Sequence, residues 1–149
     1  MIAVVQRVWE ASVTVEARVI GQIGAGLVVL VAIHMTDSAA DVTWTANKLS
    51  SLRIFRGGGK HFELDVKQSG GSILLVSNFT VAAQTRQGRR PSFDEAADPE
   101  TGRRLFDQLV EAIRATGVPV QKGEFGADML VSLANDGPVT VIVDSRAPR

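Results

Sequence analysis

Seven consecutive apolar residues at positions 27–33 constrain the fold of this chain more than any other feature. A run without polar alternation is typical of a β-strand that is buried on both faces. Such a strand must lie inside a sheet, with other elements covering it from two sides. A second apolar run, residues 72–79, contains several β-branched side chains and predicts another buried strand.

Two segments have the apolar spacing of helices instead. Thr36, Asp37 and Ser38 offer side-chain oxygens for an N-cap, and apolar residues follow at intervals of three and four. Asp98-Pro99-Glu100 combines a cap, an early proline and an acidic residue near the positive end of the helix dipole. Gly117 is expected to end this second helix. The expected buried residues are Ala39, Val42, Ala46 and Leu49 in the first helix and Leu105, Phe106, Leu109, Val110 and Ile113 in the second.

The remaining apolar segments are expected to form strands. They span residues 2–8, 12–15, 19–23, 52–55, 61–64, 118–122, 129–133 and 139–143. Two helices among roughly eight to ten strands predict an α+β domain, whose largely antiparallel sheet curls into a partial β-barrel.

Length and composition exclude several classes of function. A chain of 149 residues is expected to form one domain. Its 16 basic and 16 acidic residues balance, so electrostatic recognition must be local. The chain has no cysteine and only two histidines, His34 and His61, which argues against a metal site, a Cys nucleophile and a Ser-His-Asp triad. His34 is interpreted as a strand-end residue. Neither a signal peptide nor a membrane-spanning run is recognisable, so we expect a cytoplasmic protein.

Polar and basic residues follow the strand predicted at residues 72–79. Ser77, Asn78 and Thr80 stand where a core strand would stay apolar, and Arg86, Arg89 and Arg90 come next, with no Asp or Glu from residue 66 through 93. One interpretation is a site for a phosphate-bearing substrate at the mouth of a positive loop. The other is a strand end capped by its own hydroxyl groups, followed by a solvated loop.

A second polar segment, Asn135-Asp136-Gly137-Pro138, interrupts two apolar segments near the end of the chain. This composition is an ordinary turn signal. A Gly-Pro bond can also be cis, at a cost of about 0.5–1 kcal/mol relative to trans. The general rarity of cis X-Pro bonds favours a plain turn.

Several motifs together resemble those of the D-aminoacyl-tRNA deacylases. Ser77-Asn78-Phe79-Thr80 and Gly137-Pro138-Val139-Thr140 look like the two signature motifs of that family. The agreement extends through residues 3–8, 52–55, 85–93 and 125–129, and leaves only a tail of residues 146–149, expected to be loose.

The resemblance implies a homodimeric hydrolase that needs no cofactor or metal. Its substrate would be the ester between a D-amino acid and the 3′-terminal adenosine of tRNA, or glycine attached to tRNA. In the family the Gly-Pro bond is cis and reaches into the partner subunit's active site, which reverses the expectation of a plain turn for Gly137-Pro138. The implied fold is a compact, barrel-like α+β domain.

The resemblance also assigns roles to residues. Ser77 and Asn78 would shape the adenosine pocket, and main-chain N–H groups of Phe79 and Thr80 would stabilise the oxyanion. The Thr80 hydroxyl has no base beside it in the motif, so the 2′-hydroxyl of the adenosine is expected to assist. Asn78 is a departure, because the family usually has Gln there, and altered substrate handling is expected.

Two further residue roles and two alternative functions remain from the sequence. Arg86, Arg89 and Arg90 would contact acceptor-end phosphates, and Arg7 would either brace the Gly-Pro segment or be an ordinary strand-edge charge. A non-catalytic tRNA-binding module is the alternative function, and a small-molecule esterase is a third.

Overall fold

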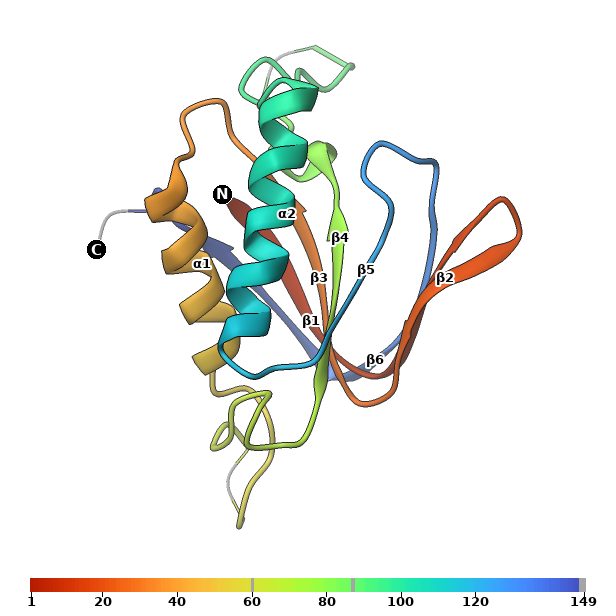
Figure 1. The fold of residues 1–149 in the computed structure, drawn as a ribbon, viewed down its shortest axis with the longest axis vertical. Helices are drawn as coiled ribbons and strands as arrows, with labels where there is room; N and C mark the ends of the chain where they lie inside the picture. Colours follow the sequence, from red (N-terminus) through yellow and green to blue (C-terminus); the bar gives the residue numbers. More distant parts are fainter. Residues whose placement is uncertain (60, 87, 148–149) are drawn as a thin grey trace.

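Six strands form one curled sheet in the computed structural model, which describes residues 1–59, 61–86 and 88–147 (Figure 1). Along the sheet the order is β2-β1-β3-β4-β5, and β6 pairs with the free edge of β1. The strand bounds are β1 Ile2–Val15, β2 Arg18–Ile23, β3 Gly26–Ala32, β4 Ser72–Ser77, β5 Val120–Lys122 and β6 Leu130–Asp144.

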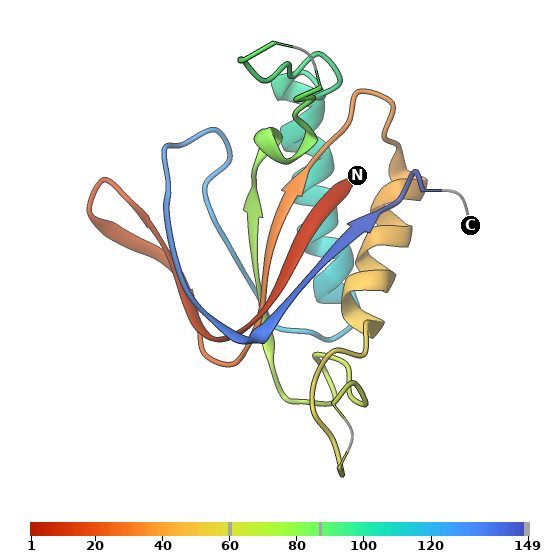
Figure 2. The same cartoon turned by 180° about the vertical axis from the view of Figure 1, so that it is seen from behind.

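The apolar run at residues 27–33 forms the central strand, as predicted. β3 lies between β1, to which it is antiparallel, and β4, to which it is parallel. Every residue of β3 except Leu30 is buried. One face of the sheet is covered by the two helices, and the curl of β1, β2 and β6 covers part of the other face (Figures 1 and 2). The larger core lies under the helices, and a smaller one, which includes Val28 and Leu74, lies inside the curl.

Both helices begin where their caps predicted. α1 spans Ala39–Ser51 after Ser38, and α2 spans Pro99–Ala115 after Asp98. The Asp98 carboxylate accepts hydrogen bonds from the main-chain N–H groups of Thr101 and Glu100. The hydrogen bond from Thr101 is the main reason why the pKa of Asp98 lies below its usual value. The chain turns after α2 at Gly117, whose φ of 86° favours glycine. The predicted buried residues are buried except Ala39, which is exposed.

Two pairs of predicted strands are single long strands in the structure. Residues 2–8 and 12–15 belong to β1, and residues 129–133 and 139–143 fall almost wholly within β6. The break expected between these two strands, at Asn135-Asp136-Gly137-Pro138, is an irregular stretch within β6, in which residues 136–139 have no partner in the β1–β6 register. The β1–β6 register shifts near Val8, and such an irregularity absorbs extra residues without ending the ladder.

Two other predicted strands do not form. Residues 52–55 and 61–64 meet in one isolated bridge, Phe55 to Leu64, and Lys60 between them is outside the described residues. The strand predicted at 72–79 ends at Ser77. The part of the chain that the structure describes therefore has six strands, not eight to ten.

The predicted fold class is confirmed. Two helices pack on a sheet whose three pairings of β1 are antiparallel and whose β3–β4 and β4–β5 pairings are parallel. Parallel pairing was not expected. Of the predicted tail 146–149, residues 148 and 149 lie outside the described part. None of the described helices combines the length and the hydropathy that a bilayer crossing requires.

Candidate active site

The end of β4 carries the first polar motif. Ser77 is the last residue of the strand, and the Asn78 N–H still donates to the Val31 carbonyl of β3, at 2.8 Å. The chain then turns into a short 3₁₀ helix, η1 (Phe79–Ala82), with Asn78 as its N-cap. The motif therefore lies at the point where the central sheet gives way to a turn.

The Asn78 amide oxygen accepts two hydrogen bonds from Thr80. The Thr80 N–H donates to Oδ1 at 3.2 Å, and the Thr80 hydroxyl donates to the same oxygen at 2.5 Å. From the resemblance, both the Phe79 and the Thr80 N–H groups were expected to be available to substrate. Of these two groups, only the Phe79 N–H lacks an acceptor within the described residues. An amide oxygen is a hydrogen-bond acceptor but not a base, so this contact does not activate Thr80 as a nucleophile.

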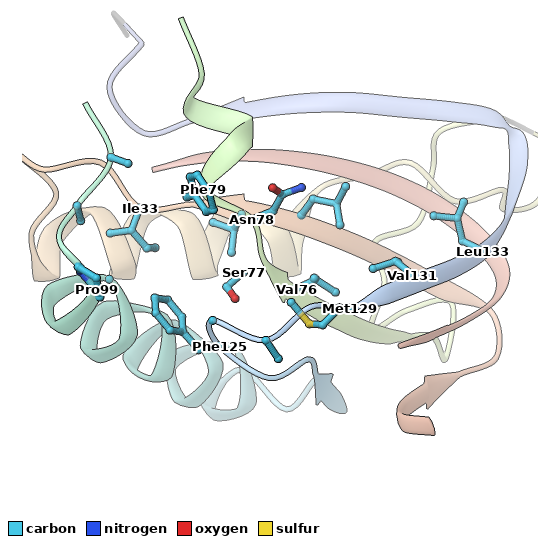
Figure 3. Close-up of a pocket in the computed structure, with 17 residues that line it drawn as sticks. Ile33, Val76, Ser77, Asn78, Phe79, Pro99, Phe125, Met129, Val131 and Leu133 are labelled. Atoms are coloured by element: carbon cyan, nitrogen blue, oxygen red, sulfur yellow. The ribbon is translucent and has the colours of Figure 1, made fainter. Parts of the chain in front are cut away.

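Next to the motif is a cavity of about 770 Å³ (Figure 3). Ser77 and Asn78 are the only residues with polar side chains among the described residues that line it. The remaining lining residues are Leu30, Val31, Ile33, Val76, Phe79, Ala96, Ala97, Pro99, Gly102, Phe125, Gly126, Ala127, Met129, Val131 and Leu133. An apolar cavity with a few convergent polar groups is the usual form of a small-ligand site.

One part of the cavity wall was not predicted as part of a site. It comes from the first turn of α2 and from the loop before β6, where Phe125 and Met129 face the cavity across from Ser77 (Figure 3). Gly102, on α2, is buried under the Phe125 ring, and a Cβ added to it would lie 3.1 Å from Phe125 Cζ. Apolar residues and glycines have no chemical signature, so the only available signal was the family-like segment 125–129.

Filling the cavity from Gly102 is expected to impair function. A leucine there would push Phe125 and project into the space beside Ser77, so we expect binding of any ligand of this cavity to weaken at least about tenfold. Gln108→Leu, on the exposed face of the same helix, is the matched control and should have no such effect. Isothermal calorimetry with a ligand of the cavity checks both variants. Equal affinities of Gly102→Leu and the unmodified protein would contradict a role for this cavity.

The basic loop lies beyond the cavity. Arg86, Arg89 and Arg90 are exposed and do not line it, and Gln87 falls outside the described residues. The loop is anchored by a bridge between Gln84 and Ser92 and by an edge-on contact of the Phe79 and Phe93 rings, whose centroids are 5.0 Å apart. The segment therefore extends from the same end of the molecule as η1 and the start of α2 (Figure 1).

The second motif lies in β6 and is held by Arg7. The Gly137–Pro138 peptide bond is cis, as the resemblance implied, and Gly137 has a φ of 130°, which favours glycine. Arg7, 3% exposed, lies across the sheet with its Nε 2.8 Å from Asp136 and an Nη donating to the Ile54 carbonyl. Arg7 is therefore not an ordinary strand-edge charge, and it makes the contact with the Gly-Pro segment that the bracing interpretation requires. Both Gly137 and Pro138 are exposed.

The two motifs lie far apart within one chain. Gly137–Pro138 stands opposite Arg7, whose neighbours across the sheet are Leu27 and then Ile73, at the start of β4. Measured along the sheet, Ser77 is four residues further along β4, or roughly 13 Å, and β4 is three strand spacings from β6, or roughly 14 Å. Neither Gly137 nor Pro138 is among the residues that line the cavity, so within one copy of the chain the two motifs do not share this site.

His34 is a strand-end residue, as interpreted. It follows β3, its Nδ1 is 2.9 Å from the Thr36 hydroxyl, and its Nε2 is 3.4 Å from a Glu95 carboxylate oxygen. It does not line the cavity. Among the described residues, no cluster of three His, Cys, Asp or Glu side chains has a geometry suited to a metal ion.

Comparisons with known proteins place these motifs in a family. A family model described as D-Tyr-tRNA(Tyr) deacylase matches residues 4–144. The chain is 52% identical to a D-aminoacyl-tRNA deacylase of Pelobacter propionicus, covering 97% of this chain and 99% of the relative, and 48% identical to one of Geobacter sulfurreducens, covering 99% and 97%.

Solved structures show the same architecture. A c-Myc DNA unwinding element binding protein superposes with a TM-score of 0.94 at 38% identity, covering 99% of this chain and all of the other. A probable eukaryotic D-amino acid tRNA deacylase, 17% identical, shares the fold with a TM-score of 0.81 and covers 95% of this chain and 97% of its own. The motifs, the fold and these similarities together show that the chain belongs to the D-Tyr-tRNA(Tyr) deacylase family.

Proposed function

We propose that this protein hydrolyses the ester that links a D-amino acid to the 3′-terminal adenosine of tRNA. The observation that carries the proposal is the apolar cavity at the end of β4, with Ser77, Asn78 and Phe79 of the signature motif in its wall. It is large enough for an adenosine and an amino acid, because ligand pockets of this kind measure about 300–1,000 Å³. Free D-amino acid and tRNA are the products. The proposed place of action is the cytoplasm, where aminoacyl-tRNA is used.

Main-chain groups and the substrate carry the proposed chemistry. An aminoacyl ester is already activated, so the protein has to position it and stabilise the developing oxyanion. The Phe79 N–H is the proposed oxyanion donor, and Ser77 and Asn78 bind the adenosine. The described residues around the cavity offer no carboxylate, imidazole or amine as a base. We therefore assign proton handling to the 2′-hydroxyl of the substrate.

The proposed active unit is a homodimer with two shared sites. The separation of the two motifs supports this proposal. Gly137 and Pro138 of one subunit do not line the cavity of their own chain, and in a dimer they would reach the cavity of the other subunit. A row of apolar side chains, Ile142, Val4 and Leu30, also runs across the uncovered sheet face toward the cavity. Ile142 is 73% exposed, and a second copy would cover it.

The partner's Gly137 and Pro138 are the proposed chiral filter. Enantiomers differ only by exchanging the hydrogen and the side chain at one carbon, so a rigid obstacle where an L side chain would project rejects L substrates. D-amino acids are then accepted with little regard to their side chains, and glycine attached to tRNA is accepted because it has none.

A direct test compares D- and L-aminoacyl-tRNA carrying the same amino acid. The purified protein is expected to release the D-amino acid and leave the L-ester largely intact. Pro138→Ala should raise L-cleavage relative to D-cleavage at least about tenfold, because it relieves the steric clash. Thin-layer quantification of released amino acid gives both rates. Equal hydrolysis of the two esters by the unmodified protein would exclude the filter.

The basic loop is proposed to contact acceptor-end phosphates. Exchanging Arg86, Arg89 and Arg90 together for Ala is expected to weaken tRNA binding and to lower the slope of log affinity against log salt concentration by about two to three. Arg18, Arg53 and Arg104, also exposed but outside this loop, form a control set. Fluorescence titration of tRNA at several salt concentrations measures the slopes. An unchanged slope in the loop variant would leave the solvated-loop interpretation in place.

The alternative function is a non-catalytic tRNA-binding module. It predicts salt-sensitive binding of tRNA with no release of amino acid. A small-molecule esterase, the third candidate, would cleave simple esters without tRNA. The same hydrolysis assay, extended to simple esters that lack tRNA, separates the three.

A further inference from the structure

Thr80 is the one residue of the first motif that does not line the cavity. Its main-chain N–H and its hydroxyl both donate to Asn78 Oδ1. Thr80 therefore contacts a residue of the cavity wall without reaching the cavity itself.

These two bonds fix the orientation of the Asn78 amide. A main-chain N–H can only donate, so the amide atom facing it must be the oxygen. The Thr80 hydroxyl then also donates its proton to that oxygen, so two hydrogen bonds hold the Asn78 side chain. The two hydrogens on Nδ2 are turned away from Thr80. Within the described part of the chain, Asn78 Nδ2 has no hydrogen-bond acceptor, and this atom is accessible to solvent.

We propose that Thr80 is a positioning residue that holds the Asn78 amide so that Nδ2 donates to an acceptor atom of the terminal aminoacyl-adenosine. This inference rests on the proposed function and specifies the role of one residue within it. The hydroxyl of Thr80 neither attacks the ester nor touches the substrate. Its effect on the substrate passes through Asn78 alone.

The length of the Asn78 side chain is part of this arrangement. An asparagine oxygen reaches the N–H two residues further along the chain and closes a compact turn. A glutamine carries its amide one methylene further out, so it cannot close the same turn on Thr80. In this chain the turn therefore sets the direction in which Asn78 Nδ2 points, and Thr80 contributes to that direction through its two hydrogen bonds to Asn78.

The test measures binding, so it does not depend on turnover. The probe is an adenosine that carries a D-amino acid through a 3′-amide in place of the ester, and calorimetry gives its Kd. Thr80→Val removes the hydroxyl and keeps the shape, and it should weaken binding roughly threefold to tenfold. Thr80→Ser restores the hydroxyl and should bind within about twofold of the unmodified protein. Thr43→Val, on the exposed side of α1, is the matched control and should not change the Kd.

A double-mutant cycle then separates positioning from direct contact. Asn78→Ala should weaken binding by about tenfold, and adding Thr80→Val to it should change nothing further, because Thr80 acts only through Asn78. Effects that multiply would show that Thr80 contacts the ligand itself and would overturn the inference, as would an unchanged Kd in Thr80→Val. If the unmodified protein does not bind the probe at all, the proposed function fails together with this inference.

Discussion

Transfer RNA whose terminal adenosine has hydrogen in place of the 2′-hydroxyl is expected to be deacylated at least about a hundredfold more slowly than ordinary D-aminoacyl-tRNA. General acid–base help is worth about 10² to 10⁴ in rate, and the cavity wall supplies no protein group for it among the described residues. The nearest acceptor of the Thr80 proton is an amide oxygen.

Single-turnover release of the D-amino acid from the two tRNAs measures this effect. Equilibrium binding of both tRNAs is the control, because it shows whether the missing hydroxyl changes affinity rather than chemistry. Equal rates on the two substrates would assign the proton transfer to a group of the protein and would contradict substrate assistance.

Arg7→Leu is expected to lower the free energy of unfolding by about 3 kcal/mol and to reduce deacylation at least about tenfold. The substitution removes the closer of the two arginine partners of Asp136, whose side chain is 14% exposed, and leaves the Ile54 carbonyl without this donor. It also removes the side chain that holds the segment containing Gly137 and Pro138. Stability and activity should therefore fall together.

Arg56→Leu is the matched control. The Arg56 side chain is 58% exposed and approaches the same carboxylate only to 3.8 Å, so its removal should cost less than about 1 kcal/mol. Urea unfolding of both variants at one protein concentration, with circular dichroism as the readout, compares them. Equal destabilisation by the two variants would mean that the buried pair does not hold this segment.

The fold could be predicted where one local signal was sufficient. The apolar run of β3 allowed no other placement, and Asp98 with Pro99 defined the start of α2. The long strands could not be predicted, because Asn135-Asp136-Gly137-Pro138 has the composition of a turn. Its place in β6 depends on Arg7, more than 120 residues earlier in the chain and adjacent only after folding.

The candidate site was predicted in part for the same reason. The polar residues at the end of β4 stand out against an apolar strand, whereas Gly102 and Phe125 across the cavity are ordinary core residues in sequence. The end of β4 at Ser77 reflects the Asn78 side chain, which caps η1 and turns the chain out of the sheet. Local composition does not specify that choice.

Mixing two defective chains tests most directly whether each site is built from two subunits. Pro138→Ala is expected to cleave L-esters as well as D-esters, and Gly102→Leu, with a filled cavity but an intact Gly137–Pro138 segment, is expected to cleave both much more slowly. Pro138→Ala chains refolded with a large excess of Gly102→Leu chains would nearly all form mixed dimers. The measurement is the ratio of D- to L-aminoacyl-tRNA cleavage by this mixture, after the cleavage by Gly102→Leu chains alone has been subtracted. A shared site predicts that the ratio returns to that of the unmodified protein, because each open cavity receives an intact segment from its partner; a ratio that stays as low as that of Pro138→Ala alone would contradict it.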